Sequence, residues 1–285
     1  MNGWGCSSVM TPLVLKFGGE LLEDPARLGI VVSAIARVAA SGVPVVIVHG
    51  GGKEIDAALD AAGIEKRQVD GLRITDGPTL NVVVSVLAGT INTRVVAALT
   101  AAGVRAVGLT GADAACGLCD QAPPHRAVDG RTIDLGRVGM PSDGSDTKLL
   151  RVLSDAGFVT VLASIGVGSD GRLFNVNADT LAGHIAARLG AWRLVVAGTT
   201  AGVLDDAGTT VGVLELPAVE RLINGGTATA GMIAKLRACT HALAHGVGDV
   251  VIVDGRDHAA LESASLGGVP ATATQLVAAG VGKRV

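Results

Sequence analysis

Short apolar runs alternate with longer amphipathic segments along nearly the whole chain. The first unit predicts a strand at residues 13–16, a helix at 25–40 and a strand at 43–48. The helix carries apolar residues three or four positions apart, from Leu28 to Val38, which places them on one face. Strands that alternate with helices in this way predict βαβ units and therefore a mainly parallel sheet.

The remaining elements follow the same alternation. Strands are expected at 104–109 (buried), 158–165, 194–196, 250–253 and 271–275 (at a sheet edge), and helices at 53–62, from about 78, and at 148–156, 179–189, 217–223 and 232–245. A loop is expected at 69–76. Residues 115–144 are rich in Gly, Pro and Asp, which predicts short hairpins at the rim. Since no linker or fixed-period repeat is present, residues 1–285 are expected to form a single domain around one continuous sheet.

The composition argues against several classes of protein. Of the 285 residues 49% are hydrophobic, but with two Trp, three Phe and no Tyr the core must consist of Val, Leu, Ile and Ala. The net charge of −3 and the lack of a Lys/Arg cluster argue against a nucleic-acid partner. The uncharged stretches 77–93 and 263–282 contain Pro78 and Pro270, which argues against a membrane span. The N-terminal residues show no secretory signal, so a cytoplasmic location is expected.

Four cysteines are too few to staple a chain of this length. Cys116 and Cys119 form a C-x-x-C pair, a pattern found in redox sites and in halves of zinc sites. A zinc ribbon needs a second such pair, and a redox pair would open a helix, whereas Pro123 and Pro124 follow this one. Both cysteines are therefore interpreted as structural, and no metal-ligating residues are predicted.

Two glycine-rich turns each follow a predicted strand, in the segments Lys16-Phe17-Gly18-Gly19 and His49-Gly50-Gly51-Gly52. A glycine-rich turn before a helix presents backbone N–H groups that bind phosphate or carboxylate groups. Because the ends of neighbouring parallel strands lie at one edge of a sheet, both turns are expected to flank one anionic ligand.

Two common nucleotide signatures do not apply. Segment 166–171 matches G-x-G-x-x-G, but the residues after it predict a returning strand instead of the helix that a dinucleotide fold requires. This segment is therefore interpreted as a hairpin turn. The P-loop pattern G-x-x-x-x-G-K-[ST] is absent from the sequence.

Polar residues near two helix starts in the second half need an explanation. Asn177 is a suitable N-cap for the helix at 179–189, but capping explains neither Asn175 nor Asp179. Lys235 lies one turn into another helix, where a cation opposes the helix dipole unless an anion is bound nearby.

These segments together resemble the amino acid kinase family, and within it the branch that acts on acetylglutamate. The resemblance covers nearly the whole chain and follows the family's order of motifs. The motifs are LKFGG at 15–19, HGGGKEI at 49–55, GLRITD at 71–76, GLTGAD at 108–113, FNVNADT at 174–180, AGMIAKL at 230–236 and VDGR at 253–256. The resemblance implies a three-layer α/β/α sandwich with a mainly parallel central sheet. In it, residues from about 12 to 175 would bind the acidic substrate and form a homodimer, and residues from about 176 to 285 would bind ATP.

The implied reaction is the phosphorylation, by ATP with Mg²⁺, of the side-chain carboxylate of N-acetyl-L-glutamate in arginine synthesis. In this resemblance Lys16 and Lys235 stabilise the transferred phosphoryl group, and Asp179 holds both ammonium groups. The other implied contacts are Gly18, Gly19 and Gly231 to nucleotide phosphates, Gly51 and Gly52 to the reacting carboxylate, and Arg73 and Asn175 to the other polar groups of the acetylamino acid.

The chemistry of this reaction agrees with those residue types. A carboxylate with a pKa near ~4 is ionised at neutral pH, so no catalytic base is required and none of the six histidines needs a role. Two anions must approach each other, so backbone N–H groups, lysines and a metal ion are the expected catalysts.

Two departures from the family pattern modify these expectations. Thr199 stands where relatives usually carry an aspartate near the nucleotide, so nucleotide affinity or choice is expected to differ. The stretch before the first strand is short, whereas arginine-inhibited relatives have a longer N-terminal helix there, so a dimer insensitive to arginine is expected.

Two other functions stay open from the sequence. The chain could phosphorylate another acid, such as a carrier-linked aminoadipate or glutamate, although the net charge of −3 disfavours the basic groove that such a substrate needs. It could also be a catalytically silent ligand-binding member of the fold, which Thr199 suggests and the presence of Lys16, Asp179 and Lys235 argues against.

Overall fold

The computed structural model describes residues 11–224 and 230–278. An eight-stranded sheet runs through this part of the chain in the order β14-β16-β15-β13-β1-β2-β10-β5. Its strands are β1 (Leu13–Phe17), β2 (Val45–His49), β5 (Ala106–Thr110), β10 (Val159–Ala163), β13 (Arg193–Gly198), β14 (Val213–Glu215), β15 (Asp249–Asp254) and β16 (Thr274–Val277). Neighbouring strands are parallel except β15 and β16, which confirms the predicted mainly parallel, continuous sheet.

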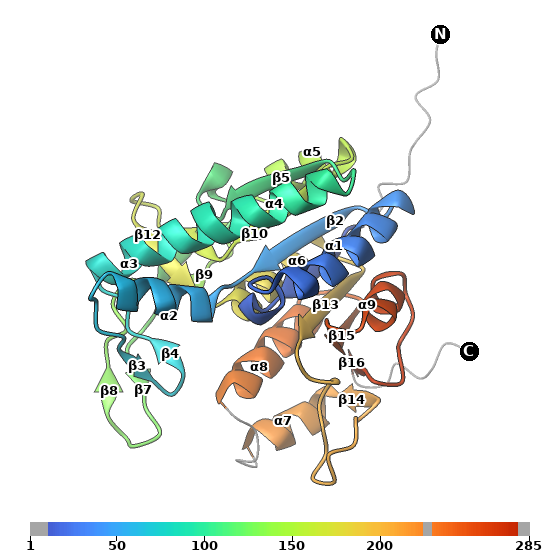
Figure 1. Ribbon diagram of the computed structural model, residues 1–285. Helices are drawn as coiled ribbons and strands as arrows, with labels where there is room; N and C mark the ends of the chain where they lie inside the picture. Colours follow the sequence, from blue (N-terminus) through green and yellow to red (C-terminus); the bar gives the residue numbers. More distant parts are fainter. Residues whose placement is uncertain (1–10, 225–229, 279–285) are drawn as a thin grey trace.

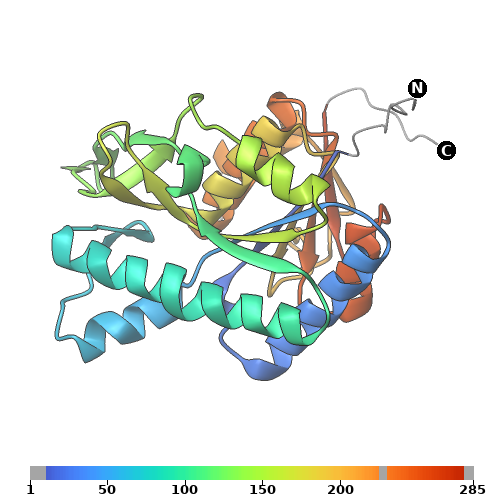
Figure 2. The same cartoon turned by 90° about the horizontal axis from the view of Figure 1, so that it is seen from above.

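Helices cover both faces of this sheet (Figures 1 and 2). One face carries α1 (Pro25–Ala40), α2 (Gly52–Ala61), α3 (Gly77–Val84), α4 (Asn92–Ala101) and α9 (His258–Ser265), and the other carries α5 (Lys148–Asp155), α6 (Ala178–Leu189), α7 (Leu216–Asn224) and α8 (Ala230–Ala244). In β1, Leu13 and Leu15 join one apolar core while Val14 joins the other, because side chains alternate across a strand. The three-layer α/β/α sandwich is therefore confirmed.

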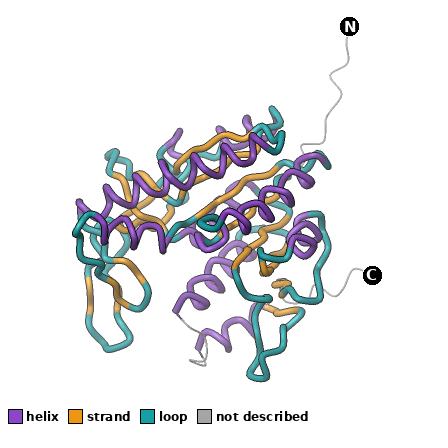
Figure 3. The backbone as a smooth tube through the Cα atoms, in the orientation of Figure 1, coloured by secondary structure: helices purple, strands orange, loops and turns teal. Residues whose placement is uncertain are grey.

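A second sheet and two hairpins form the rim of the molecule (Figure 3). The strands of this sheet are β6 (Cys119–Gln121), β9 (Val138–Pro141), β11 (Ile165–Val167) and β12 (Leu173–Val176), and the hairpins pair β3 (Gln68–Val69) with β4 (Leu72–Arg73) and β7 (His125–Arg126) with β8 (Thr132–Ile133). Since β11 returns antiparallel into β12, the interpretation of 166–171 as a hairpin turn is confirmed. The short hairpins expected within 115–144 are confirmed as well.

Three sequence expectations about strands were wrong. The strand expected to be buried at 104–109 is β5, an edge strand whose residues are all partly or fully exposed. The strand expected at the edge is β16, which is covered on its outer side by β14, a strand that was not predicted. The segment 69–76, expected as a loop, contains part of the β3–β4 hairpin. Strand order depends on contacts between distant segments, which local patterns do not report.

The described residues include one helical stretch, Gly77–Ala101, that is long and apolar enough to cross a membrane by length and composition. It runs through α3, the π-helical turn η2 (Ser85–Ile91) and α4. Val83, Leu87, Ile91 and Val95 pack into the core against the sheet and α1. Those contacts are typical of a core helix in a globular protein.

Candidate active site

The two glycine-rich turns meet at one edge of the sheet, as expected. β1 and β2 are adjacent and parallel, with Phe17 paired to His49, so the turns that follow them lie side by side. A Cβ on Gly19 would lie 2.7 Å from the Cα of Gly51, and a Cβ on Gly51 would collide with the side chain of Ile91. Position 19 therefore requires glycine, because a Cβ there would meet the backbone of Gly51, whereas a Cβ on Gly51 would have to displace the side chain of Ile91.

The backbone N–H groups of these turns are not equally free. Gly18 donates its N–H to the carbonyl of Ala197 at 3.3 Å, so this group is used in holding β1 to β13. No described residue accepts a hydrogen bond from the N–H groups of Gly19, Gly51 or Gly52, and the last two lie at the N-terminus of α2. These three N–H groups are available to an anion.

Lys16, Asp179 and Lys235 converge beside the glycine turns. Lys16 Nζ lies 2.9 Å from Asp179 Oδ1, and both side chains are almost buried. Lys235 Nζ lies 3.2 Å from the point where a Cβ of Gly198 would stand, at the end of the neighbouring strand β13. The contact of Asp179 is an ion pair, since its Oδ1 accepts no hydrogen bond of good geometry. Two cations and one anion from three distant segments thus share this corner.

The charges of this cluster act on one another. Burial lowers the pKa of Lys235, the nearby ammonium group of Lys16 lowers it further, and the carboxylate of Asp179 opposes both effects. Asn177 caps α6 by accepting hydrogen bonds from the N–H groups of Asp179 at 2.9 Å and Thr180 at 3.1 Å. The predicted N-cap is confirmed, and it orients the turn that carries Asp179.

A cavity of about 230 Å³ with both polar and apolar side chains in its wall opens on the β2 side of this corner. Its lining includes Gly51, Gly52, Arg73 and Asn175, the four residues that the sequence assigned to the acidic substrate. Arg73 is held by the carboxylate of Asp56, while its Nη1 is buried and has no hydrogen-bond partner. A buried N–H group without a partner is costly unless a ligand accepts its hydrogen bond.

Asn175 belongs to the same hydrogen-bonded wall. Its Nδ2 donates to Thr75 Oγ1 at 3.1 Å, and that hydroxyl donates to the carbonyl of Arg73 at 3.2 Å. Asn175 comes from β12 and Arg73 from β4, so the link joins the rim sheet to the β3–β4 hairpin. This chain of bonds holds both side chains at the cavity before any ligand binds.

His49 and Asn92 support the glycine turn and were missed by the sequence reasoning, which assigned no role to the histidines. His49 is fully buried, with Nδ1 3.2 Å from the carbonyl of Gly50 and Nε2 3.1 Å from Asn92 Nδ2. An amide nitrogen can only donate, so Nε2 accepts and Nδ1 carries the proton. Burial lowers the pKa of His49 to about 4, which keeps the ring neutral. The only hint in the sequence is a polar residue at the end of a wholly apolar strand.

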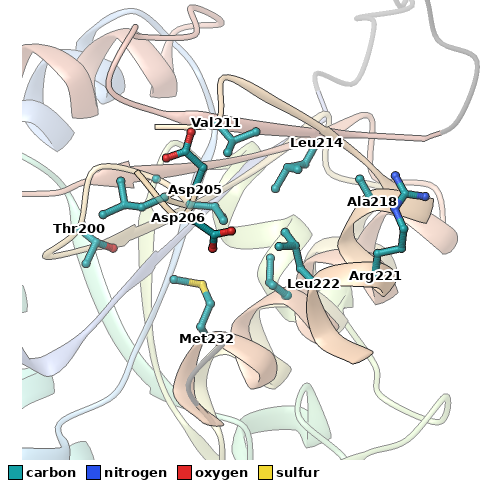
Figure 4. A pocket seen from close by; sticks show the side chains of 13 residues that line it. Thr200, Asp205, Asp206, Val211, Leu214, Ala218, Arg221, Leu222 and Met232 are labelled. Atoms are coloured by element: carbon teal, nitrogen blue, oxygen red, sulfur yellow. The ribbon is translucent and has the colours of Figure 1, made fainter. Parts of the chain in front are cut away.

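A larger and more apolar cavity of about 590 Å³ opens on the β13 side (Figure 4). The loop after β13, β14, α7 and α8 form its walls, with Val203, Leu214 and Leu222 among the apolar side chains. Thr200 lines the cavity, and so do Asp205 and Asp206. Carboxylates are therefore present on this wall although Thr199 replaces the expected aspartate.

Two further predicted positions lie away from these contacts. Gly231 is exposed in the first turn of α8, and a Cβ there would have open space around it. Cys116 and Cys119 are buried free thiols, and burial raises the pKa of each to about 12, which supports their structural interpretation. Cys6 lies outside the described residues. Within the described ranges no group of three or more His, Cys, Asp or Glu residues could hold a metal ion.

Comparison with known proteins adds to this geometry. Residues 11–254 match the model of the Amino acid kinase family. The chain is 41% identical to an acetylglutamate kinase from Rhizorhabdus wittichii over 248 residues, which cover 85% of this chain and 82% of that protein. It is equally similar to an acetylglutamate kinase from Novosphingobium aromaticivorans, at 41% over 252 residues, 85% of this chain and 83% of that protein.

Solved structures share the fold. N-acetylglutamate synthase from Neisseria gonorrhoeae, in complex with coenzyme A and N-acetyl-glutamate, has a TM-score of 0.78 and 26% identity, and the match covers 94% of this chain and 59% of the synthase. Carbamate kinase from Giardia lamblia has a TM-score of 0.68 at 14% identity, over 94% of this chain and 98% of that enzyme. The second similarity concerns the fold alone.

Proposed function

Because the chain belongs to the amino acid kinase family, we propose that it transfers the γ-phosphoryl group of ATP to the side-chain carboxylate of N-acetyl-L-glutamate, a reaction of arginine synthesis. The observation that carries this proposal is the cluster of Lys16, Asp179 and Lys235 at the place where the turns 18–19 and 50–52 meet, here called the glycine corner. A cavity lies on each side of it. The relatives at 41% identity, named acetylglutamate kinases, supply the identity of the acceptor.

The smaller cavity is suited to the acetylamino acid. Its walls combine the unpartnered Nη1 of Arg73, the amide of Asn175 and the free N–H groups of Gly51 and Gly52. An arginine N–H group and backbone N–H groups bind carboxylates through charge-assisted hydrogen bonds. The side-chain carboxylate needs no catalytic base because it is ionised at neutral pH.

The larger cavity is suited to the base and ribose of the nucleotide. Its Val and Leu side chains offer apolar contacts, and the open N–H of Gly19 lies at the corner between the two cavities. A triphosphate that reaches from this cavity to the corner would present its terminal phosphate to Lys16 and Lys235. These two ammonium groups would stabilise the negative charge of the transferred group, and Asp179 would hold Lys16 in place.

The donor atoms at the corner fit Mg²⁺ that arrives with the nucleotide. Mg²⁺ is usually held by one or two carboxylates together with substrate phosphates and water. Two carboxylates lie at this corner, that of Asp179, which is paired with Lys16, and that of Glu20, and no larger ligand cluster exists among the described residues. When bound, the ion supplies positive charge that neutralises the phosphate oxygens.

The two cavities are lined by different parts of the chain, which supports one lobe for the acceptor and another for ATP. Residues between 50 and 178 line the smaller cavity and residues between 200 and 236 line the larger one, which supports separate acceptor and ATP lobes, with the last residues of the acceptor cavity just past the predicted boundary at about 175. The edge strand β5 and the half-exposed Val82, Val84 and Val96 of the adjoining helix support the proposed homodimer. Light scattering after size exclusion would measure its mass. We retain the proposal of a cytoplasmic location.

Trapping of the product with hydroxylamine tests the reaction. The protein is incubated with ATP, Mg²⁺ and hydroxylamine, and each of N-acetylglutamate, glutamate, aspartate, N-acetylaspartate and aminoadipate is supplied in turn. We expect the coloured iron hydroxamate with N-acetylglutamate and none above background with the others. A stronger signal with aminoadipate would reassign the acceptor. Absence of signal with every acid, together with measurable ATP binding, would identify a silent member of the fold.

A further inference from the structure

Glu20 places a second carboxylate, besides that of Asp179, at the glycine corner. It follows Gly19 in the short turn η1 (Gly19–Leu21) after β1. Its carboxylate lies over Gly18, where a Cβ would collide with both oxygens. The position that a Cβ of Gly198 would occupy lies 3.2 Å from Lys235 Nζ and 4.0 Å from Glu20 Oε1, so the two side chains approach the same place. The side chain of Glu20 thus faces the phosphate-binding surface.

Within residues 11–224 and 230–278, the carboxylate of Glu20 has no hydrogen bond and no ion pair. Nearby glutamates differ in this respect, since Glu23 pairs with Lys53 at 3.2 Å and Glu54 pairs with Arg94. Asp179, the other carboxylate of the corner, is already paired with Lys16. Glu20 is therefore the carboxylate of this corner that is free to meet a ligand.

The charges at the corner indicate which kind of ligand can bind to Glu20. The two ammonium groups of Lys16 and Lys235 are balanced by the carboxylates of Asp179 and Glu20, so this cluster carries no net positive charge for a triphosphate. A carboxylate over Gly18 repels bare phosphate oxygens. A hard divalent cation reverses that effect, because it binds carboxylate and phosphate oxygens together.

We propose that Glu20 is the carboxylate that this chain contributes to the metal–nucleotide complex, so that nucleotide binding itself depends on a divalent cation. This inference rests on the proposed function, since it assumes that the triphosphate reaches this corner. Glu20 contributes attraction when the cation is bound and repulsion when it is absent.

Binding of a non-hydrolysable ATP analogue, AMP-PNP, tests the proposal without turnover. Calorimetric titrations compare the affinity in Mg²⁺ with the affinity in EDTA for the wild-type protein, Glu20→Gln and Glu23→Gln. We expect wild-type protein to bind at least about tenfold more tightly with Mg²⁺, on the scale of one charged contact. Glu20→Gln should weaken binding in Mg²⁺ and strengthen it in EDTA, so that the ratio falls several-fold. Glu23→Gln, a matched change three residues away, should keep the wild-type ratio.

The outcomes separate this inference from the proposed function. If Glu20→Gln keeps the wild-type ratio, or weakens binding equally in Mg²⁺ and EDTA, Glu20 is not a metal–nucleotide ligand and the inference is wrong although the nucleotide site stands. If the wild-type protein binds AMP-PNP under neither condition, the nucleotide site itself is wrong. Thermal unfolding of each variant confirms that the fold is intact, which is expected because the Glu20 carboxylate bonds to no described residue.

Discussion

The two cavities that flank the glycine corner are built in different ways. The smaller one carries, among apolar side chains, polar groups that are already bonded to the protein, as Arg73 is to Asp56 and Asn175 is to Thr75. The larger one is walled mainly by Val and Leu side chains, with a few charged residues among them. Polar walls select a ligand by geometry, since a ligand that lacks the matching groups leaves buried donors unpaired. Apolar walls mainly provide contact area.

The contrast suggests which ligand the enzyme chooses strictly. A preorganised polar cavity discriminates among acids, whereas an apolar cavity tolerates related nucleotides and depends on the phosphates for orientation. Lys16 lies on β1, between β2 and β13, and in the proposed reaction it would contact the phosphoryl group that passes from one ligand to the other. The following changes should separate these contributions, beginning with the largest effect.

Replacing Lys16 with alanine should reduce kcat about 10²- to 10³-fold, because it removes a positive charge from the transferred phosphoryl group, worth ~3 to 4 kcal/mol. Steady-state assays measure kcat and both KM values. Lys53→Ala is the control, since Lys53 is exposed on α2 and pairs with Glu23. Lys16→Ala leaves the buried Asp179 without its ion-pair partner, so thermal unfolding of this variant is recorded. Lys16→Arg keeps the positive charge and tests whether its exact position matters. Wild-type kcat in Lys16→Ala would remove this residue from the mechanism.

Replacing Arg73 with lysine should raise the KM for the acetylamino acid about 10- to 100-fold and leave the KM for ATP nearly unchanged. The guanidinium of Arg73 contacts Asp56 through one nitrogen and offers an N–H group of another to the ligand, and a lysine cannot do both in this geometry. A hydrogen bond to a charged group contributes ~1.5–3 kcal/mol. Arg67→Lys is the control, because Arg67 pairs with Asp76 on the exposed side of the same region. Equal effects on both KM values would show that the two cavities are not independent.

Acid should weaken the fold through two buried histidines, His49 at the end of β2 beside α4 and His184 within α6. Burial lowers the pKa of His49 to about 4, and burial followed by the nearby His241 lowers the pKa of His184 to about 4, from an ordinary value of 6.5. Both rings are neutral in the folded state, so their contribution to stability is complete above pH 6.5 and declines as the pH falls toward 4, by ~1–3 kcal/mol each.

Urea unfolding at several pH values measures this decline. His184→Gln can still bond to Ser145, which lies 3.0 Å from the imidazole, and should flatten the dependence on pH. His258→Gln, at the partly exposed start of α9, is the control. A steep loss of stability that remains unchanged in His184→Gln would assign the acid sensitivity to other groups.

The smallest effect is expected from Leu222→Ala in the larger cavity. Loss of apolar contact with the nucleotide should raise the KM for ATP about fivefold, or ~1 kcal/mol, with no change in the KM for the acceptor. Leu266→Ala, at an exposed position after α9, is the control. A large change in the acceptor KM would contradict the separate construction of the two cavities.

Much of the fold and part of the site could be predicted from local patterns. The helix predicted at 25–40 has the observed bounds, because Asp24 and Pro25 mark its start and its apolar spacing marks its buried face. The meeting of the two glycine turns also followed from the sequence, since neighbouring parallel strands end at one edge. The roles of Lys235 and Gly231, by contrast, rested on the family resemblance.

What the sequence by itself determined is most of the helices and long strands, their parallel arrangement and the chemical types gathered at the strand ends, because periodicity and turn chemistry act over a few residues. Only the tertiary structure decided that β5 lies at an edge, that β14 covers β16, that His49 meets Asn92 from 43 residues away and that Glu20 turns over Gly18. Those features depend on packing between segments far apart in the chain, where burial and charge balance select one arrangement among many that satisfy the same local pattern.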